Sequence, residues 1–305
     1  MIKETPSQLR FPAYLMNFPF SLDTSNPNNV WMKELDPKEL EVNKEKAYLQ
    51  FMDLYNFMAG SALVYLLPSY GDYQDQVYVA NLGVYLPNIT DSNNVVLSNF
   101  TSKPRQGEEK AGKPFFQLMN YETHDCPFKW EGEADLKYLH DNVYIGGYGI
   151  RSDIKAYNWM EEHFGMNIIK VNMVDEYLYH LDCSVFPLNK DKTCICTGLY
   201  EPHEIKRIEQ YTEVIDISED DAYSGITNSV RLGNTILCAS NVSELSKTDE
   251  LYYGEHQKIT ALERICANEG LEPAFFNLSE YMKSGALLSC MVLNLNYVDY
   301  KKSLL

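Results

Sequence analysis

The sequence predicts a mixed α/β (α+β) protein whose elements repeat radially around a central site, as in a propeller. Strand-like and helical stretches alternate along the 305 residues, and a hairpin-like unit recurs five times, about 45 to 60 residues apart. The composition, 45% hydrophobic and 13% aromatic, is sufficient for a large core without disulfides or metals. No linker or low-complexity stretch interrupts the chain, so we expect a single domain over residues 1–305.

Short runs rich in Val, Ile, Tyr and Leu predict the strands. These runs are 13–16, 76–79, 83–86, 94–97, 143–145, 167–171, 193–197 and 235–239. The five hairpin-like units cover 76–86, 134–146, 178–197, 225–239 and, in truncated form, 287–295. In a radial assembly, polar side chains of the inner strands converge on the axis although they lie far apart in sequence.

Apolar residues at helical spacing, with glycine or proline at the boundaries, predict the helices. The predicted helices are 36–58 ending at Gly60, 153–164 closed by Gly165, 202–211, and 254–268 closed by Gly270.

Charge and cysteine usage exclude several classes of function. The net charge of -17, without a basic run longer than a pair, argues against nucleic acid or an anionic membrane as partner. No stretch approaches the roughly 18 apolar residues of a membrane span and no apolar signal core is seen, so we expect a cytoplasmic protein. The seven scattered cysteines indicate reduced thiols. Cys194 and Cys196 share a strand face, but no second pair completes a zinc pattern.

Cys290 is the candidate nucleophile. It follows Gly285 and Ala286, small residues that let a substrate or backbone approach closely, and it precedes an apolar strand. A thiolate attacks best when its pKa is lowered or when a cationic substrate stabilises it, and a guanidinium supplies that charge. The alternative is an inert buried thiol that acts as a small hydrophobe.

His180 and Asp182 lie in a strand-like stretch, where a period of two places both on one face. We therefore expect an imidazole and a carboxylate in one cavity. The imidazole would protonate a departing amine and then activate water, and the carboxylate would pair with a guanidinium edge. The alternative is a His-Asp hydrogen bond that only stabilises the strand.

A second acidic group precedes another strand: Glu131, Glu133 and Asp135. Some of these three carboxylates must be solvated or bound to a cation, and a guanidinium matches carboxylates two hydrogen bonds at a time. Asn81 ends a strand and is equally compatible with a hairpin turn. Arg105 and Arg151 either hold a substrate carboxylate or lie solvated at the surface.

Taken together and in order, these motifs resemble those of the guanidino-group-modifying enzymes, the pentein superfamily of arginine deiminases, dimethylarginine hydrolases and amidinotransferases. The closest resemblance is to bacterial arginine dihydrolases. The motifs are Asn29-Val30-Trp31-Met32, Ala80-Asn81-Leu82-Gly83, Arg105-Gln106-Gly107-Glu108-Glu109, Glu131-Gly132-Glu133-Ala134-Asp135, Gly147-Tyr148-Gly149-Ile150-Arg151, Tyr179-His180-Leu181-Asp182, Asn228-Ser229-Val230 and Ser289-Cys290.

The resemblance implies a five-bladed αβ-propeller, the pentein fold, with one ββαβ unit per blade in pseudo-fivefold arrangement. It implies that Cys290 attacks the guanidinium carbon to give a thiouronium-type intermediate, and that His180 protonates the leaving ammonia and activates water. Glu131 would orient His180 or the substrate. The implied substrate-binding residues are Asp182 and Asp135 for the guanidinium, Arg105 and Arg151 for the α-carboxylate, and Asn29, Asn81 and Asn228. No cofactor or metal is implied, and a homo-oligomer is possible.

The function expected from the sequence is a cysteine-dependent hydrolase of L-arginine or a close relative that releases ammonia. Asn81 stands where deiminases and amidinotransferases have Asp, which favours the dihydrolase type, since an amide tolerates a neutral ureido group better than a carboxylate does. Leu82 and Glu133 depart from the family pattern and leave the exact substrate open. The alternatives are an amidinotransferase, a dimethylarginine hydrolase or citrulline ureidase, and a non-catalytic binding module.

Overall fold

The computed structural model describes residues 5–89 and 93–298. Within these ranges the strands form five separate three-stranded sheets. The sheets are β15-β1-β2 (Leu293–Asn294, Ala13–Asn17, Leu63–Leu67), β3-β4-β5 (Gly83–Tyr85, Asn94–Leu97, Glu122–Asp125), β6-β7-β8 (Leu136–His140, Val143–Tyr148, Asn167–Asn172), β9-β10-β11 (Val185–Pro187, Lys192–Ile195, Glu213–Asp216) and β12-β13-β14 (Val230–Leu232, Thr235–Ala239, Glu272–Phe276). The mixed α/β architecture predicted from the sequence is confirmed.

All five sheets have the same internal arrangement. The middle strand pairs antiparallel with the first strand and parallel with the third. A parallel partner requires a crossover connection, and a helix provides it in every sheet. The crossover helices are α1 to α3 (Val30–Glu34, Pro37–Leu40, Lys44–Ala59), α4 (Glu109–Leu118), α5 (Ile154–Phe164), α6 (Pro202–Ile208) and α8 (Glu250–Asn268). The short helix α7 (Glu219–Tyr223) follows β11 and is not part of a crossover. The helix α9 (Ser279–Met282) follows β14.

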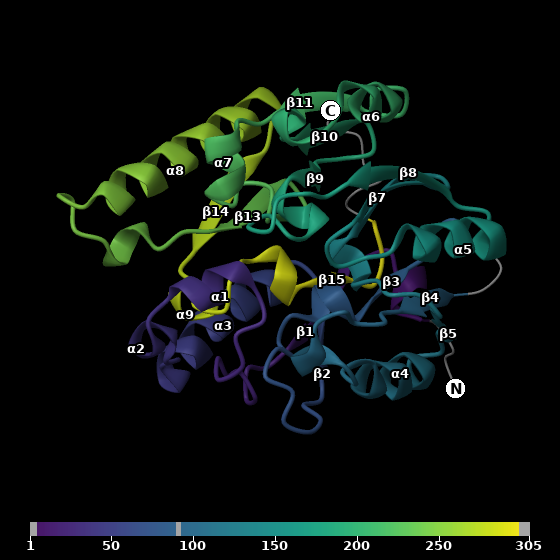
Figure 1. Ribbon diagram of the computed structural model, residues 1–305, viewed down its shortest axis with the longest axis horizontal. Helices are drawn as coiled ribbons and strands as arrows, with labels where there is room; N and C mark the ends of the chain where they lie inside the picture. Colours follow the sequence, from purple (N-terminus) through teal and green to yellow (C-terminus); the bar gives the residue numbers. More distant parts are fainter. Residues whose placement is uncertain (1–4, 90–92, 299–305) are drawn as a thin grey trace.

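The helices cover the outside of the molecule. Helices α4, α5, α6 and α8 lie at the periphery of the view, and the strands lie between them and the middle (Figure 1). Apolar clusters fill the space between each sheet and its helix. In the first sheet, Phe51, Leu54 and Met58 of α3 are fully buried together with Met16 of β1.

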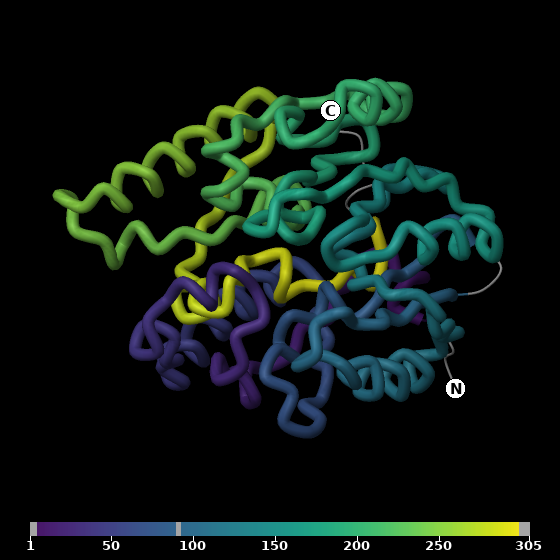
Figure 2. Tube along the Cα trace, in the orientation of Figure 1, coloured from purple at the N-terminus to yellow at the C-terminus, as the bar shows by residue number. Residues whose placement is uncertain are grey.

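The first and last strands of the described chain share one sheet. Tyr14 and Leu15 of β1 pair with Asn294 and Leu293 of β15. The segment near the C-terminal end (yellow) accordingly crosses the middle of the molecule beside the N-terminal part (purple) in Figure 2. The sheet therefore joins residues about 280 positions apart, as the register of β1 and β15 requires.

A short 3-10 turn precedes the first strand in four of the five sheets. These turns are Val79–Leu82 before β3, Gly132–Ala134 before β6, Leu181–Cys183 before β9 and Ser289–Met291 before β15. Each turn, or the residue that caps it, carries one of the candidate site residues: Asn81, Glu131, His180 or Cys290. The repeated architecture thus places polar side chains at equivalent positions of successive sheets.

Three of the predicted elements are wrong. Residues 76–79 form a turn and the start of a 3-10 helix, because the carbonyls of Asp75 and Tyr78 accept hydrogen bonds from the Arg105 guanidinium and not from a strand partner. The first predicted hairpin is therefore absent, and β3 pairs with β4. The predicted helix 36–58 is two helices, because Asn43 caps a new helix by accepting a hydrogen bond from the Lys46 amide.

The strand predicted around His180 is the third element that the structure contradicts. It is not a continuous strand, since Leu181–Cys183 is a 3-10 turn and β9 begins only at Val185. The amide of Leu181 donates to the Asp135 carboxylate, which turns the chain at this point.

Candidate active site

Six of the sequence-predicted site residues line one small cavity. They are Asn29, Asn81, Arg105, Arg151, His180 and Cys290. The cavity measures about 20 Å³, which is enough for about one water molecule. The 3-10 turns described above bring Asn81, His180 and Cys290 to the cavity from different sheets.

Cys290 lies at the wall of the cavity and is 8% exposed. The side-chain amide of Asn228 lies 3.6 Å from its sulfur, and the Asp182 carboxylate lies 4.0 Å from it. Burial, together with the negative charge of Asp182, raises the pKa of the Cys290 thiol to about 12, against the opposing effects of Asn228 and Arg105. In the resting protein the sulfur therefore carries its proton.

His180 is held by a buried carboxylate. Its Nε2 lies 2.8 Å from Glu131 Oε2, and Glu131 is fully buried. The other oxygen of Glu131 accepts hydrogen bonds from the amides of Thr101 and Ser102. Burial alone would raise the pKa of Glu131, but the hydrogen bond to His180 and the charge of Arg151 outweigh it and lower the pKa to about 2. An ionised carboxylate beside an imidazole fixes its orientation and stabilises the imidazolium when it forms.

The two arginines are near the cavity, but each already has partners. Arg105 donates to both oxygens of Glu108, with a shortest distance of 2.7 Å, and to the carbonyl of Tyr78. Arg151 donates to the carbonyl of Asn28 and lies 3.5 Å from Glu131, with its guanidinium over the ring of Tyr179. Both guanidinium groups are thus oriented before a substrate enters.

Asn29 and Asn81 both line the cavity and have different partners. Asn29 caps α1 by accepting from the Met32 amide, and it donates to the carbonyl of Ser284 at 2.8 Å. The amide nitrogen of Asn81 lies 3.3 Å from both His180 Nε2 and the Glu131 carbonyl. Asn81 is therefore within contact of the imidazole, whereas Asn29 ties two segments of the wall together.

Four predicted residues do not line the cavity. Glu131 lies behind His180, and Asn228 and Asp182 lie beside Cys290. Asp182 is fully buried and accepts a hydrogen bond from the Ser289 hydroxyl at 2.7 Å. The expectation that His180 and Asp182 point into one cavity is not met, because the 3-10 turn replaces the strand that would have put them on one face.

The position of Asp135 does not fit the substrate-binding role predicted for it. Its carboxylate accepts from the Ser152 hydroxyl at 2.6 Å and from the Leu181 amide at 3.2 Å. Burial raises the pKa of Asp135 to about 6. Its position indicates support for the turn that carries His180, without contact to the cavity.

The sequence analysis missed a carboxylate that does face the cavity. Asp75 is 3% exposed and accepts hydrogen bonds from the side chains of Asn28 and Gln74. Burial raises its pKa, and the charge of Arg105 opposes that shift. In the sequence, Asp75 stands directly before the run 76–79, which was misread as a strand. A carboxylate in a loop follows no helical or strand periodicity, so no pattern identifies it as a site residue.

Among the described residues, no group of three or more His, Cys, Asp or Glu side chains is arranged to hold a metal ion. The described helices also include none that is long and apolar enough to cross a membrane.

The fold and the site define a class of protein. Five ββαβ-type sheets bring a buried cysteine, a histidine with an ionised carboxylate partner, and an acid facing the same cavity into one place. This is the pattern of a cysteine-dependent hydrolase with the pentein fold. The chain belongs to the family "N,N dimethylarginine dimethylhydrolase, eukaryotic", whose model matches residues 16–295.

Two curated relatives are bifunctional arginine dihydrolase/ornithine cyclodeaminases. AgrE of Nostoc sp. is 26% identical over 293 residues, which are 94% of this chain and 38% of AgrE. ArgZ of Synechocystis sp. is 25% identical over 285 residues, 92% of this chain and 37% of ArgZ. The chain thus spans less than two fifths of the length of either relative.

A solved structure covers the matching part alone. The N-terminal domain of ArgZ, described as an arginine dihydrolase bound to product, superposes with a TM-score of 0.79 at 25% identity. The match covers 94% of this chain and 98% of that domain. The similarity therefore extends over nearly the whole of the domain.

Proposed function

We propose that this protein is a cysteine-dependent hydrolase of L-arginine that releases ammonia and proceeds through the ureido product to ornithine. The observation that carries the proposal is the cavity itself, where Cys290, His180 and Asn81 meet beside the His180–Glu131 pair. The similarity to arginine dihydrolases supports the choice of substrate. We also propose that the five sheets are the blades of a five-bladed propeller in one domain, which makes the cavity its axial site.

The first chemical step depends on charge supplied by the substrate. The neutral Cys290 thiol is a poor nucleophile, but a bound guanidinium stabilises the thiolate. Asp75, which faces the cavity, and Asp182, beside the sulfur, are placed to hold that guanidinium. The thiol gives its proton to the His180 imidazole, which becomes the imidazolium, and the sulfur forms a bond to the guanidinium carbon to give a tetrahedral adduct.

The second step is proton transfer by His180. As the carbon–nitrogen bond breaks, the imidazolium gives its proton to the departing nitrogen, and ammonia leaves a thiouronium-type adduct on Cys290. The neutral imidazole then takes a proton from water, which attacks the same carbon and displaces the sulfur. Glu131 stays ionised throughout, because its pKa is lowered to about 2, and stabilises the imidazolium.

The ureido product can be attacked by Cys290 once more, with proton transfer from the thiol to His180 producing the thiolate, since a neutral ureido group supplies no charge. The amide of Asn81 offers both a donor and an acceptor, and it lies 3.3 Å from His180, where a neutral ureido group would replace the charged guanidinium. A second attack by Cys290, loss of ammonia and hydrolysis of the remaining carbonyl adduct would give ornithine and carbon dioxide.

Substrate entry requires the wall of the cavity to open, because about 20 Å³ cannot hold an arginine. The segment around Asn28 and Asn29 closes it, through bonds to Arg151 and to the carbonyl of Ser284. We infer that these bonds break on entry and that Arg151 then becomes available to the substrate carboxylate, with Arg105 acting from its fixed position.

The family match supports hydrolysis of methylated arginines as a second candidate function. Both candidates are tested by incubating the purified protein with arginine, N-methylated arginines and citrulline, with the Cys290→Ala variant as blank. We expect ornithine and ammonia from arginine and from citrulline. If only the methylated arginines react, giving citrulline and a methylamine, then they are the substrates and arginine is not. Products that form equally with Cys290→Ala would contradict both candidates.

A further inference from the structure

A second, larger cavity lies next to the catalytic one. We call it the lateral groove; it measures about 490 Å³, within the range of small-molecule sites. Aromatic and aliphatic side chains form most of it, and Asn228 is among the residues that line it. Its walls include Trp31, Tyr177, Tyr223, Leu35 and Leu287. The reaction proposed above gives this groove no role.

Hydrogen bonds to carboxylates fix the aromatic walls. The hydroxyl of Tyr177 donates to Glu34, and the hydroxyl of Tyr223 donates to Asp175. The indole of Trp31 donates to the Tyr177 carbonyl at 2.8 Å, and the two rings meet edge to face at 5.0 Å. The rings are therefore oriented without a ligand, which lowers the entropy lost on binding.

The charges around these rings have one sign. Glu34 lines the groove, and Asp175 lies directly behind Tyr223. No lysine or arginine is found among the described residues that line it. Aromatic faces and nearby carboxylates both attract cations, and the aliphatic side chains offer contact to an apolar body.

The lateral groove and the catalytic cavity are neighbours that share one lining residue. Ala286 contributes to both, and the hydrogen bond from the Tyr179 hydroxyl to the Gly285 carbonyl lies in the wall between them. The side chain of Asn228, which lines the groove, lies 3.6 Å from the sulfur of Cys290. A molecule in the groove would thus sit beside the nucleophile without occupying the substrate cavity.

We propose that the lateral groove is a second binding site, for an amphipathic organic cation: a primary ammonium carried on an aromatic or branched apolar body. The oriented rings and Glu34 bind the charge, and Leu35 and Leu287 contact the body. This site is additional to the one that takes the guanidino substrate.

The test is calorimetric titration of the full chain carrying Cys290→Ala, so that no turnover interferes. The probes are 2-phenylethylammonium and its uncharged counterpart 2-phenylethanol, each with and without excess arginine. We expect the ammonium to bind at least about tenfold more tightly than the alcohol, and to bind equally well with arginine present. Equal binding of the two probes, or displacement of the ammonium by arginine, would overturn the proposal.

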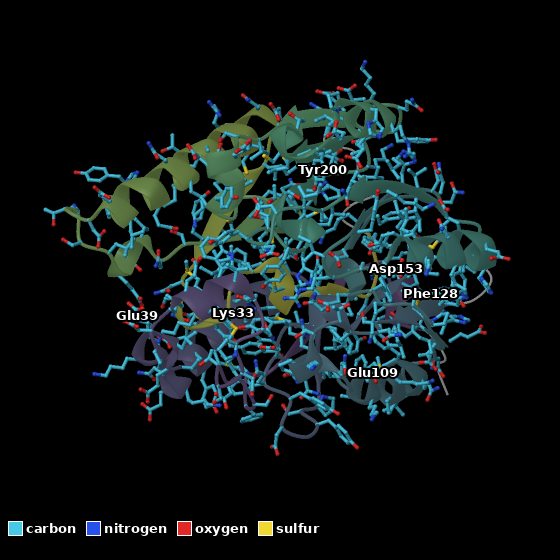
Figure 3. The ribbon with its side chains drawn as sticks, viewed as in Figure 1. Lys33, Glu39, Glu109, Phe128, Asp153 and Tyr200 are labelled. Carbon is cyan, nitrogen blue, oxygen red and sulfur yellow. The ribbon has the colours of Figure 1, made fainter. Side chains whose placement is uncertain are left out.

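Matched variants locate the site. Glu34→Gln and Tyr223→Leu should each weaken binding of the ammonium about 3- to 10-fold. Glu39→Gln removes the same charge from α2, at the outer edge of the molecule in Figure 3, and preserves the helix cap. Tyr253→Leu removes a tyrosine that is 60% exposed on α8. Both controls should leave binding unchanged. Unaltered binding in Glu34→Gln and Tyr223→Leu would contradict the assignment, whatever the enzyme hydrolyses.

Discussion

Single residues decide when the nucleophile becomes active. Cys290 is buried beside Asp182, so both its desolvation and its nearest charge keep the proton on sulfur. Under the proposed mechanism, the thiol stays unreactive until a substrate occupies the cavity. The other six cysteines are buried or half-buried free thiols in the described structure, so the chain presents little competing thiolate.

The rate of alkylation of Cys290 by iodoacetamide should reveal this. Since the pKa is raised from 9.0 to about 12, the neutral thiol is favoured throughout that interval. The rate should rise about tenfold per pH unit from pH 7 to beyond pH 9, as the thiolate fraction grows. Mass spectrometry of the peptide containing Cys290 measures it. A rate that levels off below pH 8 would show that the thiolate already exists without substrate.

Replacement of the sulfur should abolish turnover. Cys290→Ser should lower kcat at least about 1,000-fold with the fold retained, because a hydroxyl at neutral pH is a far poorer nucleophile than a thiolate. Product assays and circular dichroism give the two readouts. Cys126→Ser is the matched control, because Cys126 is similarly buried, 5% against 8% exposed, and lies outside the site. Activity close to that of the unchanged protein in Cys290→Ser would exclude covalent catalysis by this residue.

At the scale of elements, a short turn in four of the five repeats carries a candidate site residue. The turn Gly132–Ala134 follows Glu131 and begins with a glycine at φ 67°. A Cβ on Gly132 would lie 2.6 Å from the carbonyl oxygen of Ala80 and from the carbonyl carbon of Asn81. Only glycine lets the turns of Glu131 and Asn81 approach this closely.

A pair of glycine variants distinguishes the steric clash of an added Cβ at Gly132 from the cost of a positive φ in a residue other than glycine. Gly165 has φ 61° but nothing within 4 Å of an added Cβ. Gly165→Ala should cost about 1 kcal/mol of stability and leave activity unchanged. Gly132→Ala should cost more and reduce kcat at least about tenfold, since it displaces Glu131 or Asn81. Chemical denaturation and product assays provide the data, and equal activity in the two variants would argue against the close approach.

The sequence was most informative where local chemistry determines structure. The helix 153–164 was predicted correctly because Asp153 caps its start and Gly165, left-handed, ends it; Figure 3 shows Asp153 at that helix. The strand 94–97 was also predicted with its observed bounds. The turn at Leu181–Cys183 was not, because it depends on Asp135, 46 residues away along the chain. The same limit applies to the site, since Asp75 reaches the cavity through partners in other segments.

At the scale of the whole molecule, the five sheets are expected to unfold together. Shared apolar clusters link neighbouring sheets: residues of β1, β12 and β13 belong to one, and residues of β3, β4 and β6 to another. We therefore expect one cooperative transition in urea, with coincident midpoints for circular dichroism, tryptophan fluorescence and loss of activity. Trp31, Trp130 and Trp159 report from different repeats. Two separate unfolding midpoints would show that the chain unfolds as more than one domain.

The pairing of β1 with β15 has a consequence for protein synthesis. The N-terminal end of the chain leaves the ribosome first. Tyr14 can therefore pair with Asn294 only after almost all of the residues described here have been synthesised. Cys290 lies just before that last strand and emerges equally late. Cys290, proposed above as the nucleophile, therefore becomes available only after nearly all of the residues described here have been synthesised, and its site can assemble no earlier.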